Sequence, residues 1–159
     1  MASLLYEQIN SSLLSKVTDY DFLCMPEEDV ESTLLEYMKT ALSKPYCRRL
    51  FSSIAYDNEN KQLTYELKIP SQDPSEDDDF VIELLAQGML VEWTKPMVNS
   101  RLLEKQMITS SKESKFYSQA SHLATVNDVY KDARTEQKTL IRDRGFIYNS
   151  YLGGNNGQA

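Results

Sequence analysis

The sequence predicts a mainly α-helical fold, a helical bundle with a long C-terminal helix and a β-hairpin insertion at about residues 51–69. Three observations predict it. Apolar residues occupy nearly every face of a helical stretch from Phe80 to Trp93, so this stretch belongs at the centre of the bundle. A narrow apolar seam recurs at helical spacing from Ser121 to Arg144. Between residues 63 and 69, apolar and polar side chains instead alternate with a period of two, which is typical of a half-buried strand.

The first third of the chain predicts two helices. Residues 3–16 form a short amphipathic pattern, and its apolar stripe consists of Leu4, Leu5, Ile9, Leu13 and Leu14. Two interpretations of this helix remain open: it packs on its own domain, or it is an arm that reaches a neighbouring subunit. Capping chemistry at residues 18–21 predicts a brief helical turn from Asp21 to Cys24. A longer helix is predicted from Glu27 to Ser43, with acidic residues at its start and Pro45 after its end.

The β-hairpin is predicted from two β-compatible runs and the turn between them. Phe51 to Tyr56 forms the first run, Asp57 to Asn60 has good turn chemistry, and Leu63 to Ile69 alternates. An isolated hairpin is only marginally stable, so it must lie on the helices or pair with strands of other chains. The acidic residues 70–79 that follow predict a solvated linker.

The central helix is predicted to begin at Ser75, whose hydroxyl is suited to capping, and to end at a sharp corner before Pro96. A second helix is predicted to begin at Pro96. Gly88 lowers helix stability by about 1 kcal/mol relative to alanine, so a close helix crossing there is a plausible compensation. The predicted core residues of this region are Leu84, Leu85, Met89, Trp93 and Leu102.

The long helix over residues 121–144 is predicted to be capped by Ser118 or Ser121 and stopped by Gly145. One of its flanks is basic, with Lys131, Arg134, Lys138 and Arg142 at spacings of three and four. This row is either a solvated face or an inter-subunit or channel-facing stripe that meets an acidic subunit or a passing polyanion. We therefore divide the chain into one helical domain, residues 1–145, and a docking tail, residues 146–159. The partner-binding residues predicted in the tail are Phe146, Ile147, Tyr148, Tyr151 and Leu152.

Composition limits the possible functions. With 17 basic and 24 acidic residues the chain has a formal charge of −7, which argues against a protein whose main role is to coat nucleic acid. Its 159 residues, 41% hydrophobic, suffice for one core without metal or disulfide support. Cys24 and Cys47 have no CxxC spacing, so we expect reduced, buried thiols. No signal peptide and no apolar run of about 20 residues is present, so we expect synthesis in a cytoplasm and no membrane association.

Residues suited to catalysis are few. His122 is the only histidine, and no orienting acid accompanies it. The acidic pairs Glu27/Glu28 and Asp77/Asp78 stand at predicted helix starts, where the helix dipole accounts for them. No zinc spacing and no phosphate-binding glycine loop occurs. We therefore expect a protein that is not an enzyme and that has no catalytic residues, metal site or cofactor.

Two stretches carry a resemblance to a known family. Val91 to Ser100, VEWTKPMVNS, and Lys115 to Leu123, KFYSQASHL, resemble the head–tail connector (adaptor, neck) proteins of tailed bacteriophages, most closely those of short-tailed and crAss-like phages. The resemblance extends from about Leu14 to Tyr148 and is strongest between Asp79 and Leu123. The hairpin departs from this pattern, because it is larger than the simple loop expected there.

The resemblance implies a virion subunit that forms a ring, commonly of twelve copies, beneath the portal protein and continues the DNA channel toward the tail. The long helix would be the wall of the ring, and the tail from Phe146 to Leu152 would dock on the portal or a further neck protein. DNA would pass through without specific binding, and the protein would be made in the host cytoplasm. Two other classes remain: a small non-enzymatic phage regulatory protein that binds a host factor, and an enzyme with an unrecognised carboxylate pair.

Overall fold

The computed structural model describes residues 1–17, 25–107 and 113–147, with side chains placed in these ranges except at 100–107 and 113–123. The fold is mainly α-helical with a small antiparallel sheet and a long C-terminal helix, so the predicted fold class is confirmed. The elements follow in the order β1 (Ala2–Leu5), α1 (Tyr6–Leu14), α3 (Glu27–Ser43), α4 (Pro45–Arg48), β2 (Phe51–Asp57), β3 (Gln62–Leu67), α5 (Pro74–Met107) and α6 (Glu113–Ile147).

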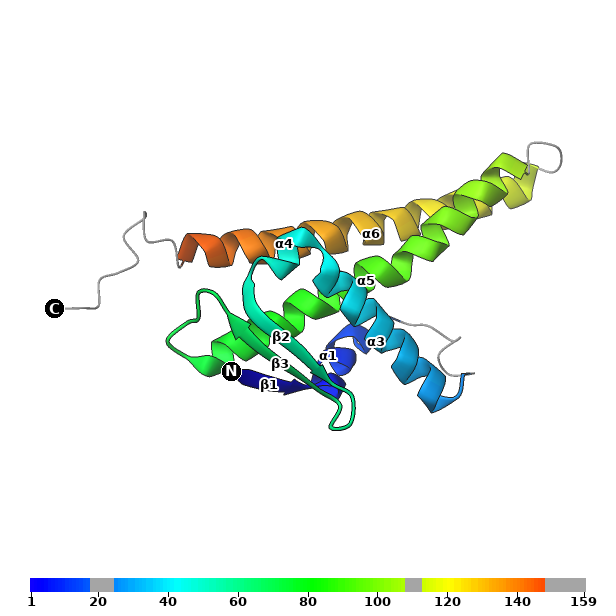
Figure 1. Cartoon of the computed structure of the whole chain (residues 1–159). Coiled ribbons are helices and arrows are strands. Elements are labelled where there is room, and N and C mark those ends of the chain that lie inside the picture. Colours follow the sequence, from blue (N-terminus) through cyan, green and yellow to red (C-terminus); the bar gives the residue numbers. More distant parts are fainter. Residues whose placement is uncertain (18–24, 108–112, 148–159) are drawn as a thin grey trace.

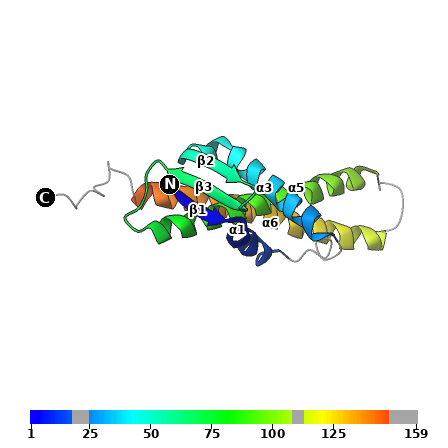
Figure 2. The same ribbon diagram turned by 60° about the horizontal axis from the view of Figure 1, so that its bottom comes forward.

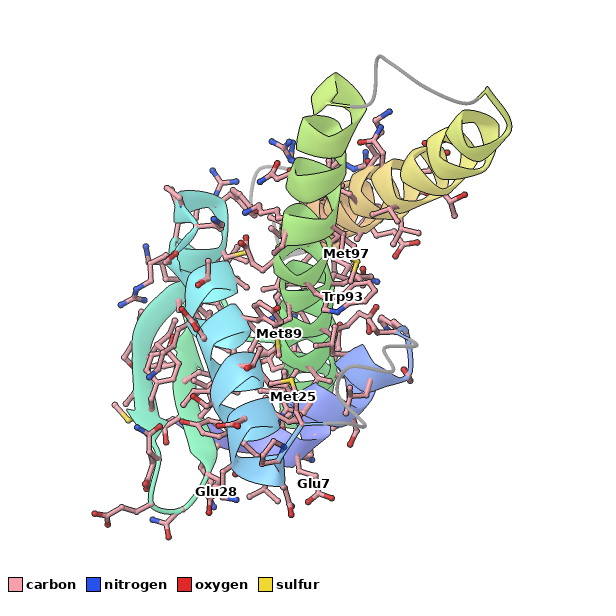
Figure 3. All side chains as sticks on the ribbon, turned by 90° about the vertical axis from the view of Figure 1, so that its right-hand side faces the viewer. Glu7, Met25, Glu28, Met89, Trp93 and Met97 are labelled. Carbon is pink, nitrogen blue, oxygen red and sulfur yellow. The ribbon has the colours of Figure 1, made fainter. Side chains whose placement is uncertain are left out.

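Helix α5 lies at the centre of the fold, with α3, α1, α6 and the sheet around it (Figure 1). The predicted core residues Leu84, Leu85 and Met89 are fully buried, as are Val81 and Ala86. The predicted core residue Trp93 is only partly buried at the edge of this core, and Figure 3 shows it on the same side of α5 as Met97. Leu102 lies outside the residues whose side chains are described.

Both predicted ends of the central helix were wrong. Helix α5 begins at Pro74, so the predicted linker, residues 70–79, ends early. Asp73 caps the helix by accepting hydrogen bonds from the Ser75 N–H (2.9 Å) and hydroxyl (2.8 Å), so Ser75 is not the cap. The helix also continues through Pro96 to Met107 without the predicted corner. Proline removes one backbone hydrogen bond, and α5 continues past it beside α6 in spite of this local cost.

Helices α5, α3 and α6 meet at Gly88. A Cβ atom there would lie 2.8 Å from the Ala41 Cβ and 2.6 Å from Gln137 Nε2, so the predicted close crossing is confirmed. The Gln137 side chain reaches across this crossing and donates to the Leu84 carbonyl (3.2 Å) and to Cys47 Sγ (3.4 Å). Cys47 is buried as predicted, and burial raises the pKa of its thiol to about 12, whereas Cys24 lies outside the described residues.

The predicted hairpin is confirmed as β2 and β3. The Asp57 carboxylate accepts from the Glu59 and Asn60 N–H groups, both at 3.0 Å, and so fixes the turn. The sheet has a third strand, in the order β1-β3-β2, because residues 2–5 pair with β3 instead of beginning the predicted helix. Ile69 was also predicted to lie in the strand, but β3 ends at Leu67 and Ile69 is exposed.

The two remaining helices of the body pack on their own chain. Helix α3 has the predicted bounds, and its predicted face is buried at Leu34 and Met38. Helix α1 packs on α5 through Ile9 and Leu13, both fully buried, so it is not an arm within this structure. The predicted turn at residues 21–24 lies outside the described residues.

Helix α6 is longer than predicted at both ends. It begins at Glu113, so neither Ser118 nor Ser121 caps it, and it continues through Gly145 to Ile147. Over residues 124–147, where its side chains are described, its buried row consists of Ala133, Gln137 and Ile141. Helices α5 and α6 lie side by side and extend together past α3, at the end opposite the sheet (Figures 1 and 2).

We predict that Gly88→Ala destabilises the protein although alanine favours helices. The new methyl group would collide with Ala41 across the crossing, so the free energy of unfolding should fall by about 1–3 kcal/mol in urea titrations. Gly145→Ala is the matched control, because a Cβ there meets no atom within 4 Å, and this change should be neutral or stabilising by up to about 1 kcal/mol. Equal effects of the two substitutions would contradict the crossing.

We also predict that Cys47 is unreactive in the folded protein. Burial raises the pKa of this thiol from 9.0 to about 12, so at pH 8 almost no thiolate forms. In a Cys24→Ser background, alkylation at pH 8 should be at least about 100-fold slower in buffer than in urea, measured by mass spectrometry. The same raised pKa means that unfolding releases a proton between pH 9.0 and about 12, so stability should fall as the pH rises through that window.

Candidate interaction surface

A buried ion pair joins the end of α6 to the start of α5. Arg144, near the end of α6, donates to the Asp77 carboxylate in the first turns of α5, and both side chains are only 10% exposed. The same Arg144 nitrogen donates to the Ile69 carbonyl (3.1 Å), and the guanidinium lies 4.4 Å from the centre of the Phe80 ring. Asp77 also accepts from the Ser71 N–H at 3.1 Å. The last turns of α6 are thereby fixed to α5 and to the segment that follows β3.

A second carboxylate of the same run links α5 to the sheet. The Tyr65 hydroxyl donates to Asp78 at 2.6 Å, and burial together with this carboxylate raises the pKa of the tyrosine. The sequence-based interpretation that the helix dipole fully accounts for Asp77 and Asp78 was therefore wrong, because both form specific long-range contacts. A signal was present in the sequence: Arg144 falls one turn after Ile141 on the buried side of α6.

Three exposed apolar residues lie at this end of the molecule. Phe146 and Ile147 are 59% and 61% exposed, and both belong to the last turn of α6 instead of the predicted tail. Ile69, which is 58% exposed, was not predicted as part of this surface, and its carbonyl is held by Arg144. We call Ile69, Phe146 and Ile147 the apolar end. The other predicted docking residues, Tyr148, Tyr151 and Leu152, lie outside the described residues.

The predicted basic row is exposed along α6. Lys131, Arg134, Lys138 and Arg142 are all exposed, and Arg142 pairs with its neighbour Asp143 at 3.1 Å. Within the described ranges the other three make no ion pair. Arg134 lies close enough to Tyr46 of α4 for its charge to favour the tyrosinate, although burial outweighs this and raises the pKa of Tyr46. These cations are therefore available to a partner.

The described residues hold no group of three or more histidine, cysteine, aspartate or glutamate side chains that could bind a metal ion. None of the helices described is sufficiently long and apolar to cross a membrane. No protein-family model, curated protein or solved structure matches the chain. The function must therefore be argued from the geometry of the exposed surfaces.

We predict that Arg144→Ala destabilises the protein far more than Arg142→Ala. Loss of Arg144 leaves the Asp77 carboxylate buried without its cation, which should cost about 3 kcal/mol, whereas the exposed Arg142–Asp143 pair should contribute less than about 1 kcal/mol. Urea titrations of the two variants would measure both effects. Similar losses in the two variants would show that the buried pair has no special structural role.

Proposed function

We propose that the protein is a structural subunit that assembles with copies of itself and with partner proteins. In the setting that the family resemblance implies, it is a head–tail connector that forms a ring between the portal and the tail of a tailed phage and continues the DNA channel. The apolar end is the observation that carries this proposal. A protein gains nothing in its own folding from leaving Phe146 and Ile147 about 60% exposed, and such surfaces commonly mark interaction sites.

The apolar end is also preorganised. Arg144 holds the last turn of α6 through Asp77 and the Ile69 carbonyl, so Phe146 and Ile147 follow directly from a fixed point. A partner that binds there orders few additional side chains, which lowers the entropic cost of association. Such an arrangement supports docking to a protein partner, and in a connector that partner would be the portal or a further neck protein.

The charge distribution is compatible with a DNA channel. A net charge of −7 limits tight binding to the phosphates of passing DNA, while the exposed cations of α6 remain available for contacts between subunits. A closed ring uses heterologous contacts, in which two different faces of each subunit meet. The basic row can serve as one of these two faces, which leaves the apolar end for the portal or a further neck protein.

We predict that Phe146→Glu/Ile147→Glu leaves the protein folded but prevents its incorporation into particles. Both side chains are mostly exposed, so the circular dichroism spectrum and the urea midpoint should change little. Leu14→Glu is the control, because Leu14 is 42% exposed at the end of α1 and is not part of the apolar end.

The measurement is the copy number of each variant in purified phage particles, with wild-type protein as the standard. Wild-type protein in particles, loss of the double variant and retention of the Leu14 variant are the expected results. Absence of the wild-type protein from particles would overturn the proposed function and favour a regulatory protein that binds a host factor.

A further inference from the structure

Helix α6 carries a row of basic residues on one flank and a row of acidic residues on another. The basic flank consists of Lys131, Arg134, Lys138 and Arg142, and the acidic flank consists of Asp128, Asp132, Glu136 and Asp143. At about 100° per residue these two rows and the buried row are each separated by roughly 120° around the helix. All eight charged residues are exposed.

The two flanks are largely unused within the subunit. Among the described residues the only ion pair on α6 that joins them is Arg142–Asp143, and Glu136 accepts a hydrogen bond from Gln87 of α5. Asp128 and Asp132 form no ion pair in the described ranges, and neither do Lys131, Arg134 and Lys138. An ordinary solvated helix mixes opposite charges so that they pair at spacings of three and four. Here, apart from Asp128 and Lys131, charged residues of these flanks that are three or four positions apart have the same sign.

We propose that the basic flank of α6 in one subunit lies against the acidic flank of α6 in the next. This interface rests on the proposed function, because it specifies how copies of the chain contact one another. The occupant is a second copy for two reasons. The flanks are complementary in charge, and they cover similar lengths of helix, about 16 Å from residue 131 to 142 and about 22 Å from 128 to 143.

The contact is heterologous, because the face that one copy uses differs from the face that its neighbour uses. Each subunit therefore retains one free flank after the first contact, and the same contact can repeat. Repetition about an axis sets the α6 helices side by side and builds a closed wall, with the buried row of each helix turned toward its own α5. A polyanion fits less well, since the acidic flank and the net charge of −7 would repel it.

The test uses full-length variants of each flank. Asp128→Lys/Asp132→Lys cancels the net charge of the acidic flank, because Glu136 and Asp143 remain. Lys131→Glu/Lys138→Glu cancels the net charge of the basic flank, because Arg134 and Arg142 remain. Glu36→Lys/Glu59→Lys is the control for Asp128→Lys/Asp132→Lys, because it changes the net charge by the same amount and sign at exposed positions of α3 and the hairpin turn. Sedimentation equilibrium at low and high salt measures self-association of each protein and of an equimolar mixture of the two flank variants.

We expect wild-type and control proteins to self-associate at low salt, and each flank variant alone to bind itself at least about tenfold more weakly. The mixture should regain association, because the intact basic flank of one variant can bind the intact acidic flank of the other. Wild-type protein that stays monomeric, flank variants that associate normally, or a mixture that stays dissociated would each overturn the inference. DNA binding by the wild-type protein would be measured in parallel. If the Lys131→Glu/Lys138→Glu variant loses that binding and the mixture does not restore it, the partner of the basic flank is a polyanion, and the inference is overturned.

The outcome for particles separates this inference from the proposed function. Flank variants that enter particles at the wild-type copy number would refute the α6 contact and leave the connector proposal standing. Absence of the wild-type protein from particles would refute the connector proposal, whatever the charge-reversal experiments show.

Discussion

The whole fold depends on covering α5. From Val81 to Val91 this helix is apolar on nearly every face, so no single neighbour can shield it from water. Helix α3 covers one side, α1 and the inner face of the sheet cover others, and α6 runs along the remainder. Gly88 allows two of these neighbours to approach closely at the same level of the helix. The exposed surfaces of the molecule are those left over once this requirement is met.

The contact between α5 and α6 differs in character from the rest of the core. The described part of α6 buries Ala133, Gln137 and Ile141, so a large amide stands at the middle of its buried row. Gln137 Nε2 finds partners in the Leu84 carbonyl and Cys47, while the Oε1 atoms of Gln137 and Gln87 have none in the structure. Buried polar atoms without partners lower stability, so the ion pair between Arg144 and Asp77 gains importance in holding α6 in place.

Elements with a strong local signal could be predicted from the sequence, and those set by distant contacts could not. The period of α3 and the alternation of the hairpin are local, and both predictions were confirmed. Strand β1 exists because residues 2–5 pair with β3, about 60 residues later, and a short apolar run does not distinguish strand from helix. Pro96 and Gly145 are strong local breakers, yet both lie within helices, and the last turns of α6 around Gly145 are held to α5 by the pair between Arg144 and Asp77.

The same division holds for the candidate surface. The exposure of the basic row followed from its residue types, whereas Phe146 and Ile147 were predicted as a docking surface from their place in a short apolar tail. The structure places all of these residues as exposed. The ion pair that organises the apolar end joins residues 67 positions apart. The position of Arg144 one turn after Ile141 indicated the side of α6 on which it lies, but nothing in the spacing identified Asp77 as its partner. Ile69 joined the surface only because β3 ended two residues early.

The proline within α5 has a mechanical consequence. Pro96 lacks an N–H, so the Glu92 carbonyl loses its helical donor close to where burial ends, since Thr94 is fully buried and Pro96 is exposed. Backbone hydrogen bonds between successive turns resist bending of a helix, and this resistance is lower where one of these hydrogen bonds is missing. Beyond Pro96, α5 therefore resists bending less than it does within the packed core, whereas α6, which contains no proline, continues unbroken beside it.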